Sequence, residues 1–98
     1  MLLTPTQTRY LRGLAHGLGA VVLLGNKGAT AAVVKELDGA LNQHELVKVK
    51  LSAADAAERK AQLETLVQGT QAQPVQQIGH VAVLFRRNAD EPKIALPR

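Results

Sequence analysis

Residues 20–28, Ala20-Val21-Val22-Leu23-Leu24-Gly25-Asn26-Lys27-Gly28, join a short apolar run to a glycine-bounded turn. The run is partly β-branched and is apolar on both sides, which predicts an inner strand covered on both faces of a sheet. Gly25 to Gly28 breaks that strand, and a helix that Thr30 would cap follows directly. A strand that turns tightly into a helix is typical of a β-α-β unit, so this stretch favours an α/β fold.

Helical spacing marks three segments of the chain. The first begins with Thr4 as cap, Pro5 at the first helical position and Gln7 in a capping box. Its apolar residues predict a buried stripe of Tyr10, Leu11, Leu14, Ala15 and Leu18, and Gly17 and Gly19 would end this helix.

The second helical segment follows Thr30 and has one apolar face, formed by Val33, Leu37, Ala40 and Leu41. The third would open with a capping box of Ser52 and Asp55 and end before Gly69, with an apolar stripe of Ala56, Leu63, Leu66 and Val67.

Three further strands are predicted over residues 44–51, 74–78 and 81–86, the last two joined by the two-residue hairpin Gly79-His80. The order is then an N-terminal helix followed by βαβαββ. Strands separated by helices pair in parallel, and the hairpin adds an antiparallel neighbour. We therefore expect an α/β fold with a four-stranded mixed sheet and packed helices, whose strand order stays open. The 98 residues would form one domain, with an extended tail at 88–98 anchored by Ile94 and Leu96.

Composition restricts the function. The net charge of +4 and the pI near 9.9 favour a polyanionic partner. Aromatic residues make up only 2% of the chain, which argues against base stacking on aromatic platforms. There is no cysteine, no apolar run long enough to span a bilayer and no secretion signal, so we expect a cytoplasmic protein.

The turn at Gly25-Asn26-Lys27-Gly28 is the best candidate for a binding site. Its glycines allow close approach to a ligand, the following helix offers N–H groups and a positive dipole end, and Lys27 adds a cation. It resembles the GXXG loop with which KH modules clamp nucleotide backbones, whereas P-loop and dinucleotide-binding patterns are absent. A plain strand-to-helix turn is the alternative.

The first predicted helix carries basic residues at i, i+3 and i+7, namely Arg9, Arg12 and His16. No acidic residue lies between Met1 and Lys35, so their charge is not balanced locally. Lys48 and Lys50 would share a strand face, either covered along their stems or available for contact, and Arg86 and Arg87 would be solvated or hold phosphates. The charges of the third helix would form intrahelical pairs.

Catalysis is not indicated. The three histidines have no metal-ligand spacing, and His44 and Glu45, as neighbours on a strand, would face opposite ways. We predict no catalytic residue, no metal, no cofactor and no small-molecule substrate.

Several of these segments resemble the YhbY family, stand-alone bacterial members of the CRM (chloroplast RNA splicing and ribosome maturation) domain group. They are Leu11-Arg12-Gly13-Leu14-Ala15-His16, Val21 to Gly28, His44 to Lys50, Gln77-Ile78-Gly79 and Lys93 to Arg98. The resemblance implies a fold similar to the C-terminal domain of bacterial translation initiation factor three. It also implies association with large-subunit precursors through ribosomal RNA.

Carried onto this chain, the family's loop falls on Gly25, Asn26, Lys27 and Gly28, and its basic helix positions fall on Arg12 and His16. Gly19-Ala20, His80 and Phe85 depart from the family pattern, and the first two remove positive charge. The predicted function is thus an RNA-binding ribosome assembly factor, expected to be a monomer. An adaptor that docks an acidic protein is the alternative, and duplex DNA binding lacks an obvious recognition helix.

Overall fold

The structure, a computed structural model, describes residues 2–98 and contains three helices and one four-stranded sheet in that part of the chain. In chain order the elements are α1 (Pro5–Ala15), β1 (Val22–Leu23), α2 (Ala31–His44), β2 (Leu46–Lys50), α3 (Ala56–Thr70), β3 (Gln73–Ile78) and β4 (Val81–Phe85). This is the predicted order, a helix followed by βαβαββ.

The strands are arranged in the order β1-β2-β4-β3. β1 pairs with β2 in parallel, while β4 is antiparallel to both of its neighbours. The expectation that helix-linked strands pair in parallel is therefore right for β1 and β2 and wrong for β2 and β3. The hairpin at Gly79-His80 returns β4 between those two strands, where it uses the hydrogen-bonding edges of both.

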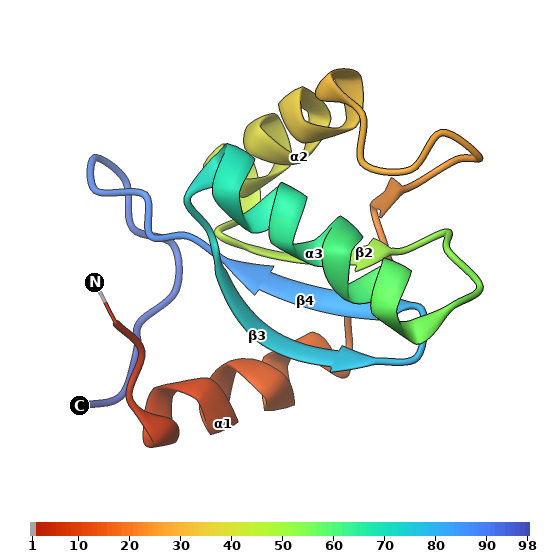
Figure 1. The fold of residues 1–98 in the computed structure, drawn as a ribbon. Helices are drawn as coiled ribbons and strands as arrows, with labels where there is room; N and C mark the ends of the chain where they lie inside the picture. Colours follow the sequence, from red (N-terminus) through yellow and green to blue (C-terminus); the bar gives the residue numbers. More distant parts are fainter. Residues whose placement is uncertain (1) are drawn as a thin grey trace.

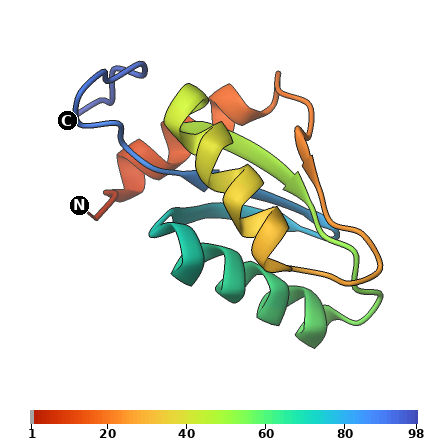
Figure 2. The same ribbon diagram turned by 90° about the horizontal axis from the view of Figure 1, so that it is seen from above.

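Helices cover both faces of the sheet. α2 and α3 lie side by side on one face, and α1 lies alone on the other (Figures 1 and 2). The larger core, between the sheet and the helix pair, includes Leu37, Leu41, Leu66, Val49 and Leu84. Gly69 allows α3 to approach α2 closely, because a Cβ there would lie 2.7 Å from Val34 Cγ1. The smaller core lies under α1 and includes Leu11, Ala15, Leu46 and Phe85.

β1 is an edge strand, which corrects the prediction of an inner strand covered on both faces. Val22 is buried against α2 and α3, but Val21 and Leu23 are 56% and 62% exposed. The two-sided hydrophobicity was misleading, because nothing in the described chain covers the outer side of β1.

The N-terminal helix has the predicted capping box, in which Thr4 Oγ1 accepts from Gln7 N–H and Gln7 Oε1 accepts from Thr4 N–H. The predicted buried stripe is only partly correct. Leu11 and Ala15 are buried, whereas Tyr10, Leu14 and Leu18 are exposed. A single helix on one end of a sheet buries a narrow face, so the residues beside that face stay outside.

Several element boundaries differ from those predicted. His44 ends α2, and Glu45 caps it with a positive φ of 64°, so the two are not neighbours on a strand. Asp55 rather than Ser52 caps α3, accepting from the N–H groups of Ala57 and Glu58. α3 continues through Gly69 to Thr70, because Gln71, at a φ of 63°, takes the left-handed position that ends the helix.

The tail after β4 has no regular secondary structure and bends at residues 89–91 and 94, and its predicted anchor residues Ile94 and Leu96 pack against the smaller core under α1. Glu45, whose side chain is completely buried, accepts hydrogen bonds of 2.7 Å from the N–H groups of Asn88, Lys93 and Ile94. Pro97 O in turn accepts from Gln7 Nε2 at 3.0 Å, which ties the tail to α1.

Candidate nucleic-acid interface

The turn from Gly25 to Gly28 closes tightly between β1 and α2, where it projects from one end of the sheet (Figure 1). Gly28 N–H donates to Gly25 O at 3.0 Å, and the two residues form an isolated antiparallel bridge. Asn26 and Lys27 are exposed at the tip. The following helix begins as predicted, with Thr30 Oγ1 accepting from Val33 N–H. The cap therefore occupies one of the N–H groups that the helix start offers to a ligand.

The two glycines of the turn have different roles. Gly28 has a φ of 74°, and a Cβ there would lie 3.0 Å from Gln62 Nε2. Gly25 has neither restriction, because a Cβ on this residue would meet no described atom within 4 Å and its φ is outside the left-handed region. The fold therefore requires glycine at 28 and leaves the surface at 25 open to an approaching ligand.

Gln62 of α3 supports this turn, a role that no sequence pattern indicated. Its Oε1 accepts from the N–H groups of Ser52 and Ala53 at 3.1 and 3.2 Å, and its Nε2 donates to Ser52 Oγ at 2.9 Å. The same amide lies under Gly28, so one side chain links the turn to the segment between β2 and α3. No local pattern marks a residue whose partners lie about ten positions away.

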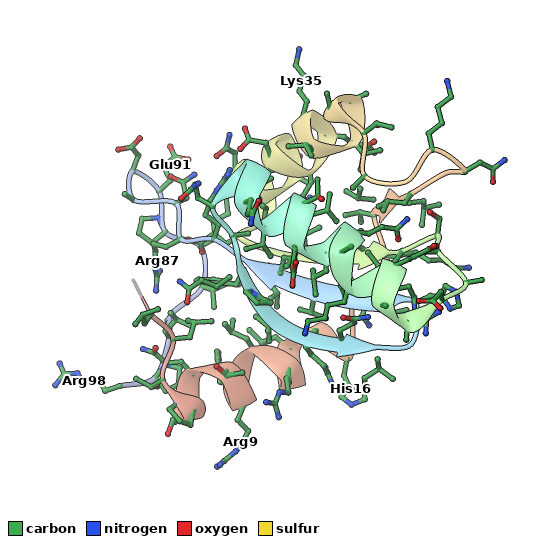
Figure 3. The ribbon with its side chains drawn as sticks, in the orientation of Figure 1. Arg9, His16, Lys35, Arg87, Glu91 and Arg98 are labelled. Atoms are coloured by element: carbon green, nitrogen blue, oxygen red, sulfur yellow. The ribbon has the colours of Figure 1, made fainter. Side chains whose placement is uncertain are left out.

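The basic residues predicted on α1 are all exposed. Arg9 points away from the sheet, and His16 lies at the end of the helix (Figure 3). Arg12 and His16 line a shallow depression of about 260 Å³ together with Lys48, Gln76 and Ile78 on the sheet. Arg9 is not part of that depression. The structure thus brings two of the three predicted residues together with a sheet lysine, and places Arg9 two helical turns before His16.

Two other arginines are used inside the protein, which decides between the alternatives that the sequence left open. Arg86 donates from Nη1 to Asp38 Oδ1 at 2.6 Å and to Thr70 O at 2.8 Å, and from Nη2 to Asp38 O and Asn42 Oδ1. Arg87 donates to Ile94 O at 2.9 Å and lies over the ring of Phe85. Both guanidinium groups hold segments of the fold together.

The charges of α3 differ from the prediction of intrahelical pairs. Arg59 Nη1 donates to the carbonyl groups of Ala53 and Ala54, and no ion pair within residues 2–98 involves α3. Arg59 instead reaches back over the helix N-terminus, where it closes the preceding turn.

Acidic residues are absent from several elements of the molecule. All eight lie on α2, on α3, at their caps or in the tail. Among the described residues, α1, the four strands and the Gly25–Gly28 turn carry no carboxylate. Outside the tail, the face of the sheet on which α1 lies therefore carries basic side chains on elements that have no carboxylate, which favours phosphate.

Other chemistry is not supported by the described residues. No three His, Cys, Asp or Glu side chains within residues 2–98 gather closely enough to hold a metal ion. None of the described helices is long and apolar enough to cross a membrane.

Comparison with known proteins gives a consistent result. Residues 3–86 match the model of the CRS1 / YhbY (CRM) domain. The chain is 46% identical over 96 residues to an RNA-binding protein of Haemophilus influenzae, covering 98% of this chain and 96% of the relative. It is 33% identical to the Bacillus subtilis protein YqeI, named a probable RNA-binding protein, over 98% of this chain and all of the relative.

A solved structure agrees with these relatives. The solution structure of a Staphylococcus aureus protein proposed to bind RNA superposes with a TM-score of 0.84 at 34% identity, covering 98% of this chain and 100% of the other. The family match spans most of the chain, and the sheet and helices described above share their arrangement with that neighbour. The chain belongs to the CRS1 / YhbY (CRM) domain family.

Proposed function

We propose that this protein binds RNA by its phosphate backbone, with the Gly25–Gly28 turn and the basic side of α1 as the contacts. One observation carries the proposal: within residues 2–98, Arg9, Arg12, His16 and Lys27 are exposed and none of them forms an ion pair. Arg86 and Arg87, by contrast, are engaged by groups of the protein itself. Unpaired basic side chains on elements that carry no carboxylate are suited to an external anion.

The protein would recognise the phosphate backbone and the shape of the RNA rather than its bases. Phe85 is completely buried and Tyr10, 42% exposed on α1, is the one exposed aromatic ring among residues 2–98, so there is no aromatic platform on which successive bases could stack. Side chains cannot read base edges in the deep major groove of an RNA helix, whereas phosphates and 2′-hydroxyls stay accessible. The relatives' names support RNA as the partner, and the family resemblance supports large-subunit precursor ribosomal RNA. The protein would act in the cytoplasm as a monomeric assembly factor without a catalytic site, metal or cofactor.

Charge reversal in the turn tests the contact directly. Lys27→Glu keeps both glycines, and Lys35→Glu on α2 is the matched control, because Lys35 is also exposed and points away from the molecule (Figure 3). Each phosphate contact contributes about 0.7–0.9 to the slope of log affinity against log salt. We expect Lys27→Glu to lower affinity for large-subunit ribosomal RNA and to reduce that slope by at least this amount. Lys35→Glu should bind like wild type.

The outcome separates the turn from other contacts. Equal binding by Lys27→Glu and the control, with both folded by circular dichroism, would show that the turn is not a phosphate contact. A flat salt response of the wild-type protein would contradict backbone binding altogether.

The ribosomal target needs a separate measurement. We expect the protein to co-sediment with large-subunit precursors in cell extract and to leave those fractions after ribonuclease treatment. Co-sedimentation that survives complete RNA digestion would instead favour docking on an acidic protein.

A further inference from the structure

Half of one sheet face lies open beside α1. The register places Leu46 opposite Phe85, both buried under α1, then Lys48 opposite Val83, and finally Lys50 opposite Val81. Because alternate residues share a face, the side chains of Lys48 and Lys50 lie on the α1 side. α1 ends before it reaches the last of these rows, so the end of the sheet nearest the hairpin is uncovered on this side (Figure 1).

The uncovered area, here called the open half, continues across all four strands. One row of paired residues crosses the sheet: Leu23 pairs with Lys50, Lys50 with Val81, and Val81 with Ile78. Leu23 and Ile78, at the two ends of this row, are 62% and 68% exposed. Val21 lies beside Lys48, to whose carbonyl its N–H donates at 3.1 Å, and it is exposed as well. The open half is thus a mostly aliphatic surface with two lysines.

Its chemistry fits a sugar–phosphate chain better than a base. The strands that form it carry no carboxylate, so an anion would meet no repulsion. It presents no aromatic ring, since Phe85 is covered by α1. Lys50 is exposed without an ion pair among the described residues. Lys48 Nζ donates to Leu18 O at 3.0 Å, and its other two protons stay available.

The open half also connects the two contacts of the proposed function. On β1, the row of paired residues ends at Leu23. Only Leu24 separates Leu23 from the Gly25–Gly28 turn, so the row ends next to the turn. At the other side, Arg12 and His16 share a depression with Lys48, Ile78 and Val81. An RNA that touches both the turn and the end of α1 would pass over this surface.

We infer that the open half is a further RNA contact, in which Lys50 and Lys48 hold phosphates while Leu23, Ile78 and Val81 pack against riboses. This inference rests on the proposed function. Exposed apolar patches of this kind mark interaction sites on soluble proteins, and lysines on strands without a carboxylate suit an anionic partner, which in the proposed function is RNA.

Two kinds of substitution separate the two kinds of contact. Lys50→Gln removes a charge, with Lys60→Gln on α3 as the matched control, since α3 lies on the opposite face of the sheet. Ile78→Thr removes apolar surface but keeps a β-branched side chain, and Leu2→Thr is its control, because Leu2 is also highly exposed. Binding of all four variants to large-subunit ribosomal RNA is measured across a salt series, with urea unfolding to verify the fold.

The expected results differ between Lys50→Gln and Ile78→Thr. Lys50→Gln should lower affinity and reduce the salt slope by about 0.7–0.9, as loss of one phosphate contact requires. Ile78→Thr should weaken binding about fivefold with an unchanged slope, because packing against a ribose releases no counterion. Both controls should bind like wild type.

Two outcomes overturn this inference without touching the proposed function, and a third overturns both. If wild type binds RNA and Lys27→Glu weakens it, but Lys50→Gln and Ile78→Thr match their controls, the open half is not an RNA contact. A concentration-dependent dimer by sedimentation equilibrium, abolished by Ile78→Thr while RNA affinity is unchanged, would assign the surface to a second copy of the chain. If wild type itself does not bind RNA, both proposals fail together.

Discussion

Adding one methyl group to each glycine of the turn tests the structure and the proposed contact in the same experiment. Gly28→Ala places an L-residue at a φ of 74°, which costs about 1–2 kcal/mol. The new Cβ also lies 3.0 Å from Gln62 Nε2, whose side chain makes three hydrogen bonds to residues 52 and 53. Displacing that amide weakens at least one of these bonds, at about 1 kcal/mol. We therefore expect Gly28→Ala to lower the free energy of unfolding by about 2–3 kcal/mol.

Gly25→Ala should behave in the opposite way. Its backbone conformation suits any residue and its methyl group meets open space, so we expect the free energy of unfolding to stay within about 0.5 kcal/mol of wild type. If a phosphate approaches the turn at Gly25, however, the methyl group blocks it and the affinity for ribosomal RNA falls. Urea unfolding gives the free energy of unfolding of both variants, and a filter-binding titration gives their affinity for ribosomal RNA.

Two results would refute this reasoning. Equal stability of Gly28→Ala and wild type would mean that the turn and Gln62 are not arranged as described. Wild-type RNA affinity of Gly25→Ala would mean that no ligand approaches that part of the turn.

Three further predictions concern contacts away from the turn. Burial raises the pKa of Glu45, but hydrogen bonds from three backbone N–H groups and the charge of Arg87 outweigh it and lower that pKa below the usual 4.5. The carboxylate therefore stabilises the fold above about pH 4.5, and this contribution is lost as the pH falls through the lowered pKa. At pH 7 we expect Glu45→Gln to have a free energy of unfolding about 2–3 kcal/mol below that of wild type. In urea unfolding experiments this difference should shrink toward pH 3. A difference that does not change with pH would contradict this account. Gly69→Ala should lower the free energy of unfolding by about 1–3 kcal/mol in the same assay, because its Cβ would lie 2.7 Å from Val34 Cγ1. An unchanged urea midpoint of unfolding would contradict the close approach of α2 and α3. Arg86→Lys loses the forked contacts to Asp38 and should be destabilised by about 1–2 kcal/mol while keeping wild-type RNA affinity; loss of affinity in the folded variant would assign it a phosphate.

Features set by neighbouring residues were predictable from the sequence. The capping box of Thr4 and Gln7, the cap at Thr30 and the hairpin at Gly79-His80 depend on residues two or three positions apart, and the structure confirms all three. The exposed basic residues of α1 were predictable for the same reason, since helical spacing fixes which residues share a side. Their role in binding stays a prediction.

Features that depend on distant packing were not predictable. The strand order decides that β1 lies at an edge, and this order follows from where β4 inserts. The spacing of Tyr10, Leu14 and Leu18 predicts a buried stripe, yet a lone helix buries only Leu11 and Ala15. Apolar periodicity shows that a face exists, but it does not show whether another element covers it.

The buried carboxylate of Glu45 connects the stability of the fold to the proposed interface. It holds the tail through the N–H groups of Lys93 and Ile94. The tail in turn packs against the smaller core under α1 and accepts a hydrogen bond from Gln7. α1 is the element that carries Arg12, and it contacts the sheet without a second helix beside it. The tail therefore supports the position of the basic side chains on α1, and the tail is held in part by a carboxylate that contacts no ligand in either proposal.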